Sequence, residues 1–324
     1  MNREISIYSH RELAIPDLVP TVIAEAGDRA SQRFLEFFMA NIRNPNTRQA
    51  YYHAVRLFLD WCEMHHISLK QVEPMIVAVY VEEMNRFRAK PTVQQHLAAI
   101  RMLCDYLVIG QVLPFNPAAS VRAPKFVIRK GKTPVLTAGE ARRLLNSIDS
   151  SHVVGLRDRA LIAVMVYSFA RVSAVIGMQV EDYYRNGKRW WLRLHEKGGK
   201  YHELPVHHQG EAYLDSYLEA AGIADQRVSP LFRSTRGQSR RLTLQRMSRR
   251  DVLRMIKRRS RAIGLSHRIC CHTFRATGIT TFLQNGGSIE TAQRIAAHES
   301  PRTTKLYDRT GDEITLDEIE RIRI

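Results

Sequence analysis

The stretch HESPRTTKLY, residues 298–307, contains two side chains that can carry out proton transfer or covalent chemistry. His298 and Tyr307 stand nine positions apart, and Ser300-Pro301 predicts a helix start between them, because proline is favoured at the first helical position. A short helix there would present Tyr307 about two turns later. Tyr307 is then either a packing residue on the edge of a last helix or a nucleophile.

Basic residues and a second histidine upstream are suited to binding a phosphate. CHTFRATG places His272 and Arg275 at positions i and i+3, on one face of a helical turn. Arg171 follows an apolar helix that ends in YSFA, where a lone arginine is costly to bury unless it binds an anion. Lys197 is expected at the tip of a β-hairpin, from which a long amine can reach into a site.

Together these residue types indicate phosphate chemistry. Two arginines can bind a phosphate through planar donors and stabilise the added charge of a pentavalent transition state. A lysine can protonate a leaving alkoxide, histidines can transfer protons, and a tyrosine can attack. The sequence contains neither a carboxylate cluster for magnesium nor a GxxxxGK[ST] loop, so a two-metal nuclease and an ATP-driven enzyme are not indicated.

No metal site and no cofactor are predicted. Five residues on and beside the hairpin have the types of metal ligands: His195, Glu196, His202, His207 and His208. On alternating strands they need not converge. The four cysteines are too few and too irregularly spaced for a disulfide framework, and we expect reduced thiols.

The charge of the chain predicts a polyanionic partner. The formal net charge is +17, and the segment from Arg227 to Arg261 has 13 arginines and lysines against one acid, Asp251. A surface this basic gains free energy by releasing counterions from a phosphate backbone. The segment lacks the Trp-, Phe- and Leu-rich face of an interfacial helix, which favours nucleic acid over membrane.

The N-terminal part of the 324-residue chain reads as helical. Residues 1–27 are expected to form a tail with one short helix around Val19 to Glu25. Apolar residues at helical spacing then predict a helical domain over residues 28–121. Its helices are expected in SQRFLEFFMANI, NPNTRQAYYHAVRLFLDWCEMHH, EPMIVAVYVEEMNRFRA and PTVQQHLAAIRMLCDYLVIG, with Asn46 or Thr47 capping the second.

A basic linker over residues 122–134 leads to a second domain, residues 135–324, of mixed α/β type. LTAGEARRLLNSI has a capping box, DRALIAVMVYSFA is an apolar core helix, and KRWWLRLHEKGGKYHELPV predicts a hairpin about its two glycines. Further helices are expected to begin at Glu211, Thr243 and Thr273, with a short last one near Leu316. The fold class is therefore mostly α with a small β-sheet.

The pattern FARVSAVIGM, HTFRATG and AAHESPRTT, followed by Tyr307, resembles the tyrosine recombinases, also called phage integrases. The order and intervals of the five catalytic positions match, and NTRQAYYHAVRLFLDWC resembles a block of the family's helical core-binding (SAM-like) domain. The hairpin lysine of the family corresponds by position to Lys197, with Lys200 as a rival. The resemblance covers about residues 28–310.

The resemblance implies a site-specific DNA recombinase that cleaves and rejoins strands through a 3′-phosphotyrosyl link and a Holliday junction, without ATP or metal. It implies Tyr307 as nucleophile, Arg171 and Arg275 as phosphate clamp, and Lys197 as general acid. His272 would exchange a proton beside Tyr307, and His298 would donate to a phosphate oxygen. The implied partners are double-stranded DNA and further copies of the chain, as a tetramer on two paired sites, with accessory proteins left open.

One position departs from the family pattern. Many members have an acid three residues after the first arginine, and here that residue is Ala174. The departure keeps open a DNA-binding accessory protein with weakened catalysis. The same residue types also serve relaxation of DNA by an enzyme like the type IB topoisomerases.

Other DNA contacts are expected near helix starts in the helical domain, in the linker and in the basic segment. Most would bind phosphate and carry affinity without sequence information. The candidates are Arg48, Gln94, Gln95, Lys125, Arg129, Lys130, Lys132, Arg240, Arg241, Arg249 and Arg250.

The closing stretch ITLDEIERIRI has a small apolar stripe of Leu316, Ile319 and Ile322, for which we expect docking on a neighbouring copy rather than on its own domain. The first residues lack an apolar signal region, and no apolar run is long enough to span a membrane. We therefore expect a cytoplasmic protein that associates with the nucleoid when bound to DNA. The short tail favours a plasmid, transposon or chromosome-resolution system.

Overall fold

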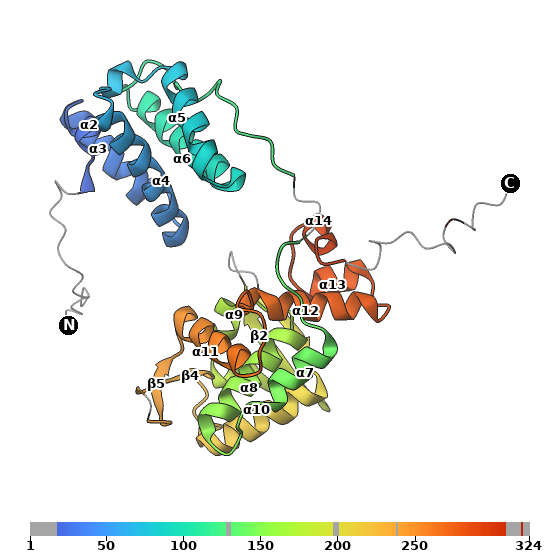
Figure 1. Cartoon of the computed structure of the whole chain (residues 1–324). Helices are drawn as coiled ribbons and strands as arrows, with labels where there is room; N and C mark the ends of the chain where they lie inside the picture. Colours follow the sequence, from blue (N-terminus) through green and yellow to red (C-terminus); the bar gives the residue numbers. More distant parts are fainter. Residues whose placement is uncertain (1–17, 128–130, 197–200, 238, 309–318, 320–324) are drawn as a thin grey trace, which may run out of the picture. The chain divides into compact units, whose positions relative to one another are not determined.

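The computed structural model describes residues 18–127, 131–196, 201–237, 239–308 and 319. The chain divides into two compact units, residues 1–127 and residues 128–324, and each is considered by itself (Figure 1). The expected fold class, mostly α with a small β-sheet, is confirmed, and the described residues form two small sheets. None of the helices in the described ranges has the length and apolar composition that a membrane crossing requires.

The described part of the first unit is entirely helical, and α4 packs against α6. The short helix expected near residue 20 is present as α2, and its Val22 and Ile23 lie in the core of this unit. The elements are α2 (Thr21–Ala24), α3 (Asp28–Glu36), the π-helical turn η1 (Phe37–Asn41), α4 (Pro45–Met64), the 3-10 turn η2 (Leu69–Gln71), α5 (Pro74–Phe87) and α6 (Lys90–Ile109).

The cap expected for the second long helix, Asn46 or Thr47, is wrong by two or three residues, because the observed cap is Asn44. The side chain of Asn44 accepts hydrogen bonds from the backbone N–H of Asn46 at 3.0 Å and of Thr47 at 3.3 Å. Pro45 occupies the first helical position, where its fixed φ and missing N–H fit a helix start. The proline therefore determines that the preceding residue is the cap of α4.

The second unit surrounds one apolar helix, α8, which contacts α7, α9, α10 and α12. The capping box predicted at Thr137 and Glu140 opens α7. The helices and turns are α7 (Ala138–Asn146), α8 (Val153–Tyr167), α9 (Val172–Gly177), η3 (Val180–Asp182), α10 (His208–Ala221), α11 (Arg249–Ala262), α12 (Cys271–Gln284), α13 (Ile289–Ile295) and α14 (Pro301–Lys305).

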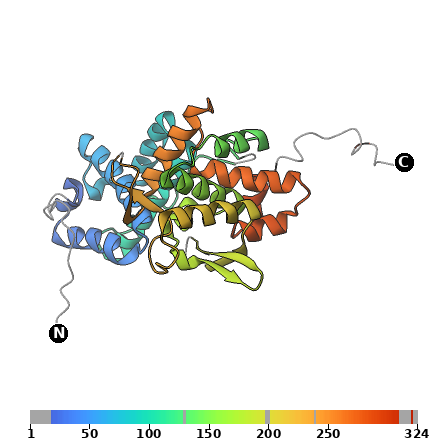
Figure 2. The same ribbon diagram turned by 90° about the horizontal axis from the view of Figure 1, so that it is seen from below.

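Two small antiparallel sheets complete this unit. The strands β1 (Tyr183–Asn186), β2 (Arg189–His195) and β3 (Tyr201–Pro205) form one sheet in that order. Figure 2 shows this sheet at the edge of the unit, outside the cluster of helices. His195 pairs with Tyr201, so β2 and β3 form the predicted hairpin, whose tip at 197–200 lies outside the described residues.

The prediction of a helix that begins at Thr243 is wrong. The segment Leu242–Arg246 is strand β5, which pairs with β4 (Arg233–Thr235), and the helix starts only at Arg249. Ser248 caps it through a capping box with Asp251. The alternating sequence LTLQR gains its hydrogen-bond partners from a strand that lies earlier in the chain.

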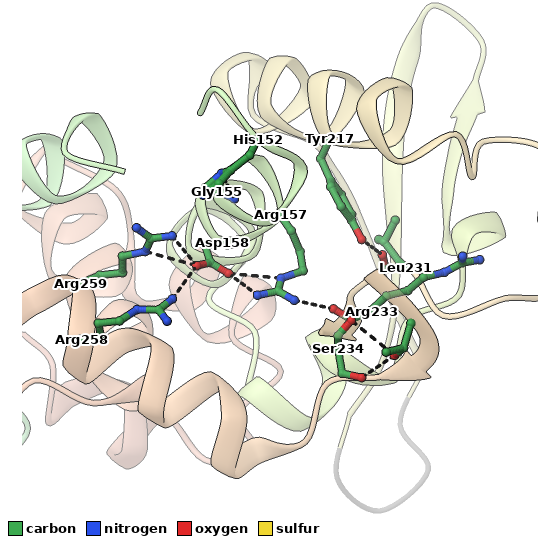
Figure 3. A network of polar contacts seen from close by, with 11 residues as sticks. His152, Gly155, Arg157, Asp158, Tyr217, Leu231, Arg233, Ser234, Arg258 and Arg259 are labelled. Carbon is green, nitrogen blue, oxygen red and sulfur yellow. Dashed lines mark hydrogen bonds and ion pairs between the residues drawn. The ribbon is translucent and has the colours of Figure 1, made fainter. Parts of the chain in front are cut away.

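A buried carboxylate joins α8 to α11 (Figure 3). Asp158 is 0% exposed and accepts hydrogen bonds from Arg157 Nη2 at 2.6 Å and Arg259 Nη2 at 2.8 Å. Arg258 lies 3.4 Å from the same carboxylate, and Arg157 also donates to the carbonyl of Arg233 in β4 at 2.7 Å. This network ties the basic helix α11 and the ribbon β4–β5 to the core helix.

Candidate active site

Five of the six residues predicted to be catalytic lie in the described part of the chain, and the structure brings them together. They come from the start of α9, from α12 and from the segments flanking α14, and they are Arg171, His272, Arg275, His298 and Tyr307. Lys197 and its rival Lys200 lie outside the described residues.

Arg275 is the most deeply buried of these five, with 2% of its surface exposed. Its guanidinium donates to the carbonyl of Phe169 and, at 2.6 Å, to the carbonyl of Ala296. Burial, and then the charge of Arg171, lower the pKa of Arg275 to about 10, while Glu196 and the Tyr307 hydroxyl oppose this shift. At neutral pH it remains a cation fixed between two segments of backbone.

Unusual backbone conformations lie at the first of these acceptors and directly after the second. Phe169 has a φ of +52°, and Ala297, which follows the second acceptor, has a φ of +48°. Non-glycine residues rarely adopt this left-handed region, and such strain concentrates at functional sites. Backbone of unfavourable conformation therefore lies beside both contacts of Arg275.

Arg171 is the N-cap residue of α9, with its side chain 29% exposed. Its Nη1 donates to Glu196 Oε2 at 2.5 Å, and its backbone N–H lies 3.4 Å from Glu196 Oε1. Glu196 directly follows β2, and only 2% of its side chain is exposed. The acid had been considered as a metal ligand, but its partner in the structure is an arginine.

The two histidines have pKa values below the ordinary value. Burial, and then the charges of Arg275 and Arg171, lower the pKa of His298 to about 3. Partial desolvation and the same two charges lower the pKa of His272, although this residue is exposed at the start of α12. Both rings are therefore neutral at physiological pH.

Tyr307 lies two residues after the end of α14 and is half-buried. Its ring is parallel to that of His298, with the centroids 5.8 Å apart and the planes at 10°. Its carbonyl accepts a hydrogen bond from Thr280 at 2.9 Å, which ties it to α12 of the same chain. His298 Nδ1 lies 3.0 Å from the Thr304 hydroxyl, so α14 holds this imidazole.

The predicted DNA contacts differ in the exposure of their side chains. Arg48 donates to the carbonyl of Ile42, and Gln94 donates to the carbonyl of Pro124, so both have partners within the first unit. The described candidates on exposed positions are Gln95, Lys125, Lys132, Arg240, Arg241, Arg249 and Arg250. Arg129 and Lys130 lie outside the described residues.

A cavity of 910 Å³ lies elsewhere in the second unit, beside the ribbon β4–β5 and α11. Arginines of the basic segment line it together with Arg157, and none of the predicted catalytic residues does. Sequence reasoning missed Arg254, Arg258 and Arg259 as individual residues here, although the charge count had marked their segment. It also missed Thr280 and Thr304, for which no local signal exists.

Comparisons with known proteins identify the family of this chain. The sequence pattern of the phage integrase family matches residues 134–313, and that of the phage integrase N-terminal SAM-like domain matches residues 32–109. The enzyme class is therefore that of the tyrosine-type DNA strand transferases. The chain belongs to the phage integrase family.

Related sequences and structures cover most of the chain. A tyrosine recombinase XerC of Thermodesulfovibrio yellowstonii is 26% identical over 84% of this chain and 91% of its own length, and one of Pelobacter propionicus is 28% identical over 82% and 84%. The XerH recombinase bound to a palindromic difH substrate has a similar fold, with a TM-score of 0.69 and 16% identity over 90% of this chain and 88% of that one. A lambda integrase dimer bound to a COC′ core site also has a similar fold, with a TM-score of 0.67 and 19% identity over 88% of this chain and 79% of that one.

Proposed function

We propose that this protein is a site-specific DNA recombinase that uses Tyr307 to cleave and rejoin DNA strands. The observation that carries the proposal is the convergence of two arginines, two neutral histidines and one tyrosine in a single site. The relatives named tyrosine recombinase XerC and the DNA-bound neighbours support it, as does the net charge of +17.

In the proposed reaction the Tyr307 oxygen attacks a DNA phosphorus atom, and the bond to the 5′-oxygen breaks. Arg171 and Arg275 bind the non-bridging oxygens and stabilise the charge of the transition state. The product is a 3′-phosphotyrosyl link and a free 5′-hydroxyl, and attack by a 5′-hydroxyl of a partner duplex reverses the step. The phosphotyrosyl bond replaces a phosphodiester, so rejoining needs no ATP. The two arginines supply the positive charge for which other phosphoryl-transfer enzymes use a metal ion.

The histidines divide the proton chemistry between them. His272, neutral because its pKa is lowered, accepts the phenol proton and returns it in the reverse step. When the Thr304 hydroxyl donates to Nδ1 of His298, the proton of the neutral ring lies on Nε2, which donates to a phosphate oxygen. Lys197 supplies the proton to the leaving 5′-oxygen.

Exchange between two duplexes through a Holliday junction requires four active sites, and we propose a tetramer on paired recombination sites. The apolar stripe of Leu316, Ile319 and Ile322 would dock on a neighbouring copy, and Ile319, its one described residue, is 51% exposed. The remaining predicted DNA contacts would bind phosphates along the duplex.

The test begins by recovering duplexes that the full-length protein binds from a randomised pool. A nicked version of the recovered site then traps the covalent intermediate, because the short strand beyond the nick diffuses away. We expect an adduct that survives SDS with wild-type protein and none with Tyr307→Phe. An adduct of normal yield with Tyr307→Phe would refute the assignment of the nucleophile.

A plasmid with two recovered sites separates recombination from the alternatives. Recombination exchanges the flanking DNA, whereas relaxation as by a type IB topoisomerase changes only the linking number. A DNA-binding accessory protein would bind the site tightly and form no adduct on any nicked substrate. Either of these outcomes would replace the proposed function.

A further inference from the structure

One carboxylate lies among the cations of the site. The Glu196 side chain is 2% exposed, directly after β2, and is 2.5 Å from Arg171. Its charge also raises the pKa of Arg275, against the effects of burial and of Arg171. Arg171 and Arg275 repel each other, and the negative charge of Glu196 reduces this repulsion. The same acid lies where a phosphate must bind.

A buried carboxylate beside a phosphate site is costly. Removing its charge from water costs free energy, and the carboxylate repels an incoming anion. The pair with Arg171 offsets these costs only if the geometry is good, and here the carboxylate meets both the side chain and the backbone N–H of one residue. The contact fixes Arg171 relative to the hairpin of β2 and β3, because Glu196 directly follows β2.

Three residues after Arg171, where the family pattern often has an acid, this chain has Ala174. Ala174 lies one helical turn after Arg171 in α9 and is 3% exposed, in the core of the second unit. A methyl group cannot accept a hydrogen bond from a guanidinium. In the described part of the chain the carboxylate paired with Arg171 comes from the hairpin, not from its own helix.

We propose that Glu196 is a positioning residue for DNA cleavage: it acts through Arg171 and takes the place of the acid that is missing at Ala174. The proposal rests on the function proposed above. Glu196 holds Nη1 of Arg171, and the other N–H donors of the guanidinium fork stay available to a phosphate oxygen. Arg171 therefore does not have to be reoriented when DNA binds.

The test compares Glu196→Gln with a matched control, Glu203→Gln. Glu203 lies on β3 of the same hairpin and pairs with Arg193 at 3.1 Å, but at an exposed position. The measurements are the single-turnover rate of adduct formation on the nicked site and the DNA dissociation constant from fluorescence anisotropy. Glu196→Gln should cleave about 10- to 100-fold more slowly, because small misplacements of a positioned group have effects of this size.

DNA affinity should move differently from the rate. Removing a negative charge beside the bound phosphate favours binding, so the dissociation constant of Glu196→Gln should be unchanged or lower. Glu203→Gln should match wild type in both measurements. A variant that was merely misfolded would lose affinity and rate together.

A double-mutant cycle with Arg171→Lys tests whether Glu196 acts through Arg171. If it does, Glu196→Gln should slow cleavage less than about threefold in the Arg171→Lys background, because coupled residues are not additive. The full 10- to 100-fold loss in both backgrounds would show a structural role and overturn the proposal. Faster cleavage by Glu196→Gln would show that the acid restrains Arg171, and would also overturn it.

Failure of this proposal is distinct from failure of the proposed function. If wild type forms a Tyr307-dependent adduct and Glu196→Gln forms it at the same rate, only the role of Glu196 is refuted. If wild type forms no adduct at all, the proposed function fails first, and the role of Glu196 in cleavage fails with it.

Discussion

Replacing Asp158 by asparagine should strongly destabilise the second unit. The carboxylate is 0% exposed and forms ion pairs with Arg157, Arg258 and Arg259 (Figure 3). Its loss therefore leaves positive charges in the interior without the negative charge that balances them. Breaking a buried ionic network by removing one partner costs about 3–5 kcal/mol. For a unit of this size each kcal/mol lowers Tm by about 2–4 °C, which gives a decrease of about 6–20 °C.

Fluorescence can follow the second unit alone. The chain has 3 tryptophans, of which Trp190 and Trp191 lie in β2 and Trp61 lies in α4. In a Trp61→Phe background, thermal unfolding followed by tryptophan fluorescence therefore reports on the second unit. Reporting on one unit also avoids treating a two-unit chain as a single transition.

Arg258→Ala is the matched comparison within the same network. The Arg258 side chain is 65% exposed and lies 3.4 Å from the carboxylate, so its removal should cost less than about 1 kcal/mol. The decrease in Tm should then be under about 4 °C. Equal decreases for the two variants, or a smaller one for Asp158→Asn, would refute the view that the buried carboxylate holds α11 to α8.

The further predictions concern packing, titration and thiol reactivity. Gly278→Ala should lower the free energy of unfolding by about 1–3 kcal/mol, because its Cβ would meet the Val166 carbonyl oxygen at 2.1 Å. Gly139→Ala, whose Cβ would have nothing within 4 Å, should raise the free energy of unfolding by roughly 0.5–1 kcal/mol. The same fluorescence assay measures both variants. Since the pKa of His298 is about 3 instead of 6.5, NMR signals of its ring should not titrate between about pH 5 and 8. The unfolded chain binds this proton more readily, so His298 should lower stability progressively as pH falls below 6.5, an effect that His298→Gln should remove in pH-dependent denaturation. Burial raises the pKa of the Cys104 thiol to about 12, so a maleimide at neutral pH should leave this residue unmodified in native protein and label it in urea, as mass spectrometry would show.

Much of the fold follows from local signals that the sequence contains. Thr137 and Glu140 form their capping box within four consecutive residues, and the apolar run of α8 needs no partner to be recognised as a core helix. The start of α11 was placed too early because β5 becomes a strand only by pairing with β4. That pairing joins segments which the local pattern cannot relate.

The site divides in the same way. The types and intervals of Arg171, Arg275 and Tyr307 were sufficient to suggest phosphate chemistry. The role of Glu196 could not be predicted, because no local pattern shows which cation an acid at the end of a strand will meet in the folded chain. Its partner is determined by the packing of α9 against β2, which is a tertiary contact.

The supports of the two arginines explain how this site can be ready before DNA arrives. Arg275 is held by two backbone carbonyls and Arg171 by one carboxylate, so folding rather than DNA binding orders both guanidiniums. Donors fixed in advance stabilise a transition state without the cost of reorganisation. Changes to these supports should therefore act mainly on the cleavage rate. Changes to exposed basic residues such as Arg249 should act on affinity instead, and each lost phosphate contact should reduce the salt dependence of binding by about 0.9 in slope.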